Sequence, residues 1–155
     1  LQYGPLRLRC ALGKGGISSR KREGDGATPL ACMPLVSAYR RSGGTGGPRF
    51  ALPTRTTLAN DGWCDTVGHP AYNHPVRLPF AGSAERMRRE DRLYDGVVVL
   101  DWNLKRRARG LGSAIFLHVA REGYAPTEGC VALSRRDLDR LAPFLKQGMR
   151  LVVMR

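Results

Sequence analysis

Short strand-like runs with brief connections between them most constrain what this chain can fold into. Apolar and β-branched residues gather in these runs, and glycine, proline or charged residues interrupt them. The runs cover residues 6–12, 30–39, 50–58, 97–100, 113–119, 129–133 and 150–154, and Pro53 interrupts the third of them. The connections are too short for the repeated crossover helices of a parallel α/β sheet. The sequence therefore predicts a mostly β fold, a mixed and mainly antiparallel β-sandwich with one or two short helices.

Two segments carry helix signals. Ser83–Leu93 is densely charged and begins with a possible N-cap, so we expect a surface helix there. Ser134 and Asp137 have the spacing of a capping box, with Asp in the place of Glu. The apolar residues that follow fall on one helical face, and Pro143 should end the regular helix. The members of that face are Leu138, Leu141, Phe144 and Leu145.

The length of 155 residues suits one domain with its own core, so we expect a single domain over 1–155. No apolar run approaches the roughly 18 residues of a membrane span. The chain begins at Leu1 without a signal peptide, which we interpret as a processed or trimmed chain. We expect a monomer that is at most peripheral to a membrane.

One histidine and one cysteine near the end of the chain suggest chemistry. His118 closes a strand-like run and shares a strand face with Ala114 and Phe116. Cys130 follows twelve residues later in a Thr-Glu-Gly-Cys turn. A neighbouring imidazole can activate a thiol as a nucleophile, and the amides of Gly129 and Cys130 could hold an oxyanion. On spacing alone, a buried structural cysteine beside a core histidine explains the pattern equally well.

The residues around this pair resemble a known active-site signature. Ile115–Val119, a loop and then Thr127–Val131 are similar to the strand histidine and the Ser/Thr-x-Gly-Cys turn of the L,D-transpeptidase (YkuD-type) family. Upstream, Gly24–Leu30 resembles the Gly-x-x-Thr-Pro element of that family. The resemblance implies a peptidoglycan-modifying cysteine acyltransferase without a cofactor. In such an enzyme Cys130 forms a thioester with a stem peptide, and His118 is the general base and acid.

Departures from the family pattern bear on the substrate. Glu128 precedes the Gly-Cys pair, Ala132 stands where Arg or Asn is usual, and Ala31 replaces a glycine. With the short loop between His118 and Cys130, these features resemble a compact branch from Gram-negative bacteria. That branch joins the first-position L-alanine of one stem to diaminopimelate of another, a 1,3-type cross-link formed by a side-chain amine acceptor. The resemblance also implies a periplasmic location.

Two other functions remain open. The same site could serve an endopeptidase or carboxypeptidase if water replaces the acceptor amine. A basic binding module without catalysis is the other alternative, because Lys and Arg number 26 against 13 acidic residues, a net charge of +13. The basic residues are spread along the chain without a recognisable nucleic-acid motif, so we expect peptidoglycan stem peptides, which are anionic, and no nucleic acid as partner.

Residues 61–75 are the second unusual stretch, and we interpret them as a wall of the substrate cleft. Asp65 and Asn73 are our candidates for contact with the stem peptide, although both residue types also bond readily to their own backbone. Trp63 and Tyr72 are expected to pack in the interior. The Cys-x4-His-x4-His spacing in this stretch does not match a usual zinc site, so no metal is predicted.

Further assignments are less specific. Thr127 and Ser113 are candidate hydroxyls around the reacting pair, and Glu128 could meet the substrate. Residues 41–48 form a glycine-rich loop without the lysine of a P-loop. The other cysteines are Cys10, Cys32 and Cys64, which permit at most one disulfide if Cys130 stays reduced, and the sequence chooses no pair.

Overall fold

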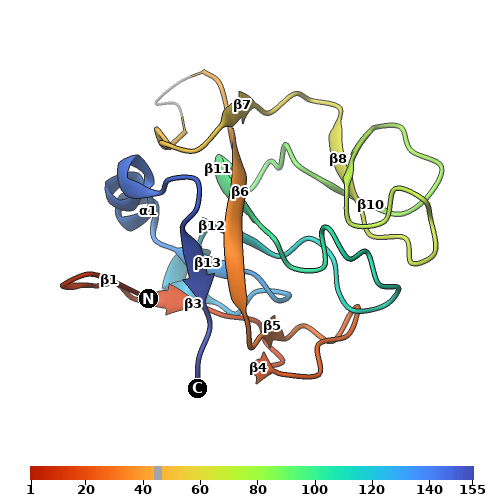
Figure 1. Cartoon of the computed structure of the whole chain (residues 1–155). Coiled ribbons are helices and arrows are strands. Elements are labelled where there is room, and N and C mark those ends of the chain that lie inside the picture. Colours follow the sequence, from red (N-terminus) through yellow and green to blue (C-terminus); the bar gives the residue numbers. More distant parts are fainter. Residues whose placement is uncertain (44–46) are drawn as a thin grey trace.

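The computed structural model describes residues 1–43 and 47–155, so part of the predicted glycine-rich loop, residues 44–46, lies outside the described residues. Strand accounts for 32% and helix for 9%, which confirms the prediction of a mostly β fold. The sheets curl into a sandwich-like arrangement in which β6 runs through the middle (Figure 1). No helix among the described residues is long and apolar enough to cross a membrane.

The largest sheet has seven strands in the order β14-β6-β11-β12-β13-β3, with β7 paired to β6. Most pairs are antiparallel, but β12 pairs β13 and β6 pairs β7 in parallel, which makes the sheet mixed. Its strands are β3 (Cys10–Ala11), β6 (Cys32–Arg40), β7 (Thr54–Thr56), β11 (Gly96–Leu100), β12 (Phe116–Val119), β13 (Val131–Leu133) and β14 (Arg150–Val152).

Three smaller sheets complete the strand architecture. The largest of them has the order β10-β8-β9 and lies beyond one face of the main sheet (Figure 1). The remaining two are the antiparallel pair β1-β2 and the parallel pair β4-β5. Their strands are β1 (Gln2–Tyr3), β2 (Leu6–Arg7), β4 (Ile17–Ser18), β5 (Thr28–Pro29), β8 (Asp61–Cys64), β9 (Pro75–Arg77) and β10 (Ala84–Arg86).

The core divides into two apolar clusters because side chains alternate across the buried strand β11. Val98 and Leu100 face the first cluster, which also contains Leu138 and Leu141 of the helix. Val97 and Val99 face the second cluster, which the aromatic rings of Tyr39, Trp63, Tyr94 and Phe116 dominate. Cys130 belongs to this second cluster, so the candidate nucleophile lies at the edge of an aromatic core.

The predicted C-terminal helix is confirmed as α1 (Arg135–Leu141). The Ser134 hydroxyl caps it by accepting a hydrogen bond from the Asp137 backbone N–H at 3.1 Å. A 3₁₀ turn that contains Pro143, η2 (Ala142–Phe144), follows directly. Phe144 is half exposed instead of buried on the apolar face, because the change of helix type turns it away from that face. A second 3₁₀ turn, η1 (Glu122–Tyr124), lies in the loop between β12 and β13.

The surface helix predicted over Ser83–Leu93 is wrong. Residues 84–86 pair with β8 as strand β10, and residues 85–90 alternate between partly or fully buried and exposed positions. Glu85, Met87 and Arg89 consequently point inward, and Met87 is fully buried. Pairing with a neighbouring strand has overridden the helix propensity of the charged residues.

The predicted strand over residues 113–119 is shorter than expected. It begins only at Phe116, because Ala114 adopts a left-handed backbone with φ 52° that cannot continue a strand. The run over residues 6–12 is likewise divided, into β2 and β3. All four cysteines are free thiols.

Candidate active site

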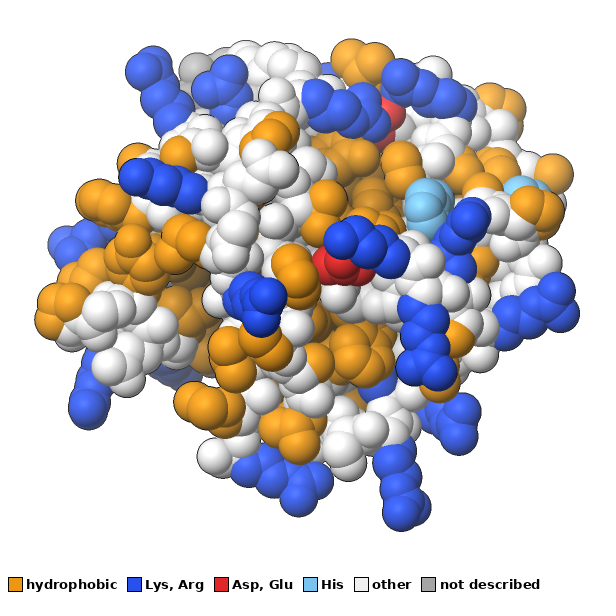
Figure 2. Space-filling model, in the orientation of Figure 1, with side chains coloured by type: hydrophobic (Ala, Val, Ile, Leu, Met, Phe, Trp, Pro, Cys, Tyr) orange, Lys and Arg blue, Asp and Glu red, His pale blue; other side chains and the backbone are white. Residues whose placement is uncertain are grey.

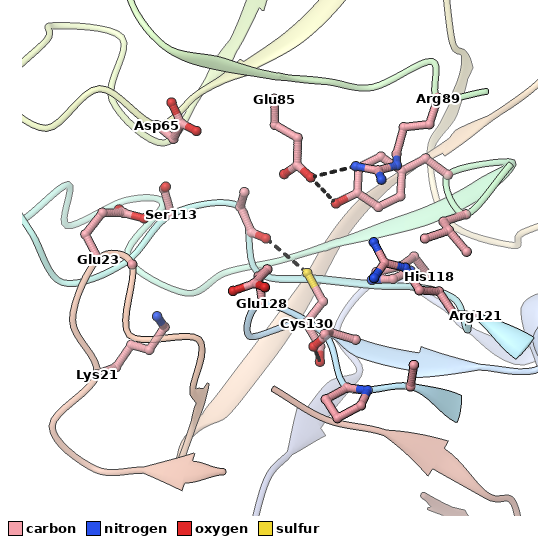
Figure 3. Close-up of a pocket in the computed structure, with 17 residues that line it drawn as sticks. Lys21, Glu23, Asp65, Glu85, Arg89, Ser113, His118, Arg121, Glu128 and Cys130 are labelled. Atoms are coloured by element: carbon pink, nitrogen blue, oxygen red, sulfur yellow. Dashed lines mark hydrogen bonds and ion pairs between the residues drawn. The ribbon is translucent and has the colours of Figure 1, made fainter. Parts of the chain in front are cut away.

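The parallel pairing of β12 with β13 brings His118 and Cys130 to the same place. In this register His118 lies opposite Ala132, and Cys130 immediately precedes β13. Both side chains line one pocket of about 370 Å³ (Figure 3). The thiol and the imidazole that the sequence singled out therefore share a cavity that can admit a ligand.

The pocket combines a few apolar side chains with many charged ones, and several loops contribute to it. Asp65 and Glu85 lie on one side of the Cys130 sulfur, whereas His118 and Arg121 lie on another (Figure 3). The complete lining consists of Lys21, Glu23, Gly24, Asp65, Glu85, Arg89, Leu93, Tyr94, Ser113, Ala114, His118, Arg121, Ala125, Pro126, Thr127, Glu128 and Cys130.

The Cys130 thiol is 7% exposed and makes two hydrogen bonds to the chain that leads into β12. Its Sγ donates to the carbonyl oxygen of Ala114 at 3.2 Å and accepts from the backbone N–H of Phe116 at 3.3 Å. Burial, and secondarily the nearby Glu85 carboxylate, raises the pKa of the thiol to about 12. Cys130 is consequently a neutral thiol at neutral pH.

The His118 imidazole is held with a defined tautomer. Its Nδ1 lies 2.8 Å from the backbone carbonyl oxygen of Val119, and because a carbonyl only accepts, Nδ1 must carry the proton. Nε2 is then the basic nitrogen. Burial lowers the pKa of His118 to about 4, so the ring is neutral at neutral pH. The edge of the ring packs against Tyr94, with centroids 5.1 Å apart.

A neutral thiol beside a neutral imidazole differs from a preformed thiolate–imidazolium pair. The base is free to take a proton, and the thiol still has one to give. In the resting arrangement this proton points to the Ala114 carbonyl, so it must reorient before His118 can accept it. The geometry thus suits general-base activation at the moment of attack.

A family model described as the L,D-transpeptidase catalytic domain matches residues 3–154 of this chain. The chain belongs to the YkuD-type L,D-transpeptidase family. The family indicates a cysteine-dependent transpeptidase. Comparisons with curated proteins and with solved structures give no match.

The turn that carries the cysteine of this L,D-transpeptidase domain is braced by Thr127. The Thr127 hydroxyl donates to the Cys130 carbonyl at 2.7 Å and accepts from the Gly129 N–H at 3.1 Å. Gly129 has φ 131°, and a Cβ there would come 2.8 Å from the backbone oxygen of Ala27, so only glycine fits. Because the Gly129 amide is already bonded, the Cys130 amide is the better placed of the two predicted oxyanion donors.

The other predicted site residues occupy different positions. Asp65 lines the pocket, and its Oδ1 is buried without a hydrogen-bond partner among the described residues. Ser113 also lines the pocket. Glu128 stands exposed at the rim, in an ion pair with Lys14 at 2.9 Å. Asn73 does not line the pocket, because it is 2% exposed and its amide is bonded within the protein.

The two aromatic residues predicted to pack in the interior do so. The Trp63 ring meets Phe116 edge-on, with centroids 5.0 Å apart, and is 3% exposed. Tyr72 is also 3% exposed, and its hydroxyl donates a hydrogen bond to the Glu23 carboxylate. Among the described residues, no group of three or more His, Cys, Asp and Glu side chains could hold a metal ion.

Sequence reasoning missed the wall formed by Glu85, Arg89 and Tyr94. The Tyr94 hydroxyl donates to Glu85 Oε1 at 2.7 Å, and Arg89 Nη1 lies 3.4 Å from the same oxygen. The Arg89 guanidinium also lies over the Tyr94 ring, 5.1 Å from its centroid. Burial raises the pKa of Glu85. Glu85 and Arg89 lie in a densely charged stretch, so their residue types alone did not mark them as pocket residues. Only the alternation of inward and outward side chains along residues 85–90 distinguishes them from the other charged residues there.

Lys21 is a further pocket residue that sequence reasoning did not single out, and it is 4% exposed. Its Nζ donates to Asp25 and to the Arg22 carbonyl oxygen. Many other basic side chains remain on the surface, and Figure 2 shows them spread over the visible face. The net charge of +13 attracts anionic ligands to the molecule over long distances, whereas the pocket lining itself carries both signs of charge.

Proposed function

We propose that this domain is a peptidoglycan L,D-transpeptidase whose nucleophile is Cys130 and whose general base is His118. The observation that supports it is the shared pocket, which is lined both by a neutral thiol and by a neutral imidazole whose Nε2 carries no proton. The anionic stem peptides of peptidoglycan suit the net charge of +13. Such a substrate would place the protein in the periplasm of a Gram-negative bacterium.

In the first half-reaction His118 Nε2 takes the thiol proton while Sγ attacks a carbonyl carbon of the donor stem. The Cys130 amide, which the Thr127 brace orients, donates to the developing oxyanion. When the C–N bond of the donor breaks, the leaving amine takes the proton from His118. The products are a thioester on Cys130 and a neutral imidazole, ready for a second proton transfer.

In the second half-reaction a diaminopimelate side-chain amine of another stem attacks the thioester. Its excess proton passes through His118 to the departing thiolate, which restores the resting site. The amine arrives as an ammonium ion, which must lose one proton to solvent before its nitrogen can attack. Asp65 Oδ1, which has no hydrogen-bond partner among the described residues, can accept a hydrogen bond from it. Glu85 lies on the same side of the sulfur and adds negative charge there (Figure 3). We propose the L-alanine–diaminopimelate linkage as the product.

Incubation with purified muropeptides and mass spectrometry of the products tests this function. The wild-type protein should give cross-linked dimers, and fragmentation should place the new bond at L-alanine. Cys130→Ala should give none, whereas the control Cys32→Ala, which removes an exposed thiol, should retain them. Dimers formed by Cys130→Ala at the wild-type rate would exclude the mechanism.

The same assay separates the alternatives. Products that are shortened monomers, with or without an acceptor peptide, would identify a hydrolase. Binding to peptidoglycan that leaves every muropeptide intact would identify a binding module. A cross-link whose donor carbonyl belongs to diaminopimelate instead of L-alanine would agree with the thioester mechanism but would exclude the 1,3-type linkage.

A further inference from the structure

Asn73 is a buried residue that connects three distant parts of the chain. Its Oδ1 accepts hydrogen bonds from Trp63 Nε1 at 3.0 Å and from the Ala114 backbone N–H at 2.9 Å. Its Nδ2 donates to the Trp102 carbonyl oxygen at 2.9 Å. The amide is therefore fixed from both ends, and one of the groups it holds is the backbone next to the thiol.

Ala114 has a backbone conformation that an alanine adopts only when its surroundings impose it. Its φ of 52° lies in the left-handed region, where Cβ is too close to the following carbonyl. Strain of this kind collects at functional sites and persists when neighbouring groups hold it. The hydrogen bond from the Ala114 N–H to Asn73 is a contact of that kind.

The strained residue acts directly on the nucleophile. The Ala114 carbonyl oxygen accepts the hydrogen bond of the Cys130 thiol at 3.2 Å, and the Phe116 N–H donates to the same sulfur at 3.3 Å. Residues 114–116 therefore hold the sulfur from two sides. If Ala114 relaxed to a negative φ, its carbonyl would turn and the thiol would lose its acceptor. A hydrogen bond donated by the thiol stabilises the neutral form only.

We infer that Asn73 is a positioning residue of the nucleophile, which keeps the Cys130 thiol protonated and aimed at the Ala114 carbonyl until substrate arrives. Asn73 touches neither the sulfur nor the pocket, and it acts through the left-handed backbone of Ala114. The role of Cys130 as nucleophile rests on the proposed function, but the hydrogen-bond chain from Asn73 to the thiol does not.

The test measures alkylation of Cys130 by iodoacetamide against pH, with peptide mass spectrometry to separate the four thiols. In Asn73→Ala the Ala114 conformation loses its anchor, so the thiol should ionise at a lower pH. Loss of one hydrogen bond to the neutral thiol corresponds to an increase of about fivefold in the alkylation rate at pH 8. The buried Cys64 reports on folding, because it should stay unreactive as long as the domain is intact.

Two further variants separate positioning from a general effect on the fold. Adding Ala114→Gly to Asn73→Ala should return the rate to within about twofold of wild type, since glycine adopts this φ without strain. Trp63→Phe removes the other donor to Asn73 Oδ1 and keeps an aromatic ring, so it should leave the profile unchanged.

A variant at Ala114, which links Asn73 to the Cys130 thiol, tests the inference even if Asn73→Ala unfolds. Ala114→Val keeps Asn73 but resists the left-handed conformation, because valine is β-branched, and it should raise alkylation in the same sense. Profiles of Asn73→Ala and Ala114→Val that coincide with wild type, with Cys64 protected, would overturn the inference. So would a double variant that behaves like Asn73→Ala alone. Because no substrate is present, these results are independent of the transpeptidase assay.

Discussion

Acidification should destabilise the fold through His118, and the size of the effect follows from its burial. The folded ring has a pKa of about 4, whereas an unfolded histidine titrates near 6.5. Below pH 6.5 the His118 imidazole is protonated in the unfolded chain, whereas in the folded protein it stays neutral until the pH approaches 4. The contribution to stability is therefore complete above pH 6.5 and is lost as the pH falls toward 4. Between pH 8 and pH 5 the loss amounts to about 2 kcal/mol.

Urea denaturation at pH 8 and pH 5 measures this loss. For a domain of this size about 2 kcal/mol corresponds to a decrease of about 1 M in the urea midpoint. In His118→Gln the decrease should be smaller by that amount. The matched control His69→Gln, which removes a partly exposed imidazole, should keep the full wild-type decrease.

Other groups also titrate in this pH range, and comparing wild type with His118→Gln cancels their effects on stability. The raised pKa of Glu85 acts in the opposite direction, because the folded state gains protons there as the pH falls. The pKa values of Asp25 and Asp91 are lowered, so their stabilising effect is lost mainly below pH 4. An equal midpoint decrease in wild type and His118→Gln would show that the ring titrates normally and would refute the burial argument.

Three further predictions concern the cap, the core and the thiol. Ser134→Ala removes the hydrogen bond to the Asp137 N–H and should destabilise the domain by about 1 kcal/mol in urea denaturation. Phe116→Ala empties a fully buried aromatic site and should destabilise by about 3–5 kcal/mol, which an unchanged urea midpoint would contradict. Glu85→Gln removes a buried charge that raises the pKa of Cys130 and should increase Cys130 alkylation at pH 8, whereas a decrease would show that Glu85 favours the thiolate.

The spacing of apolar residues along the sequence was enough to predict most of the strands and the C-terminal helix. A strand that is buried on both faces, such as Val97–Leu100, consists of β-branched and apolar residues whichever strands pair with it. The cap of α1 was equally visible, because Ser134 and Asp137 interact within one turn. His118 and Cys130 were identified from residue type and local motif, for which no long-range contact is needed.

The tertiary structure decided whatever depends on a partner far along the chain. Residues 84–86 became a strand because β8, some twenty residues earlier, offered an unpaired edge, and this turned Glu85 and Arg89 into the pocket. Asn73 was expected at the substrate, but the backbone 41 residues away fixes its amide in the interior.

The protonation states of Cys130 and His118 likewise could not be predicted from the sequence. A motif indicates which thiol and imidazole to consider, but the pKa of each depends on how much water the surrounding elements exclude. Tyr94 and Phe116 pack around the pair, and burial keeps both groups neutral. The sequence thus determined which thiol and imidazole are the candidates, and the packing of distant segments decided their protonation states.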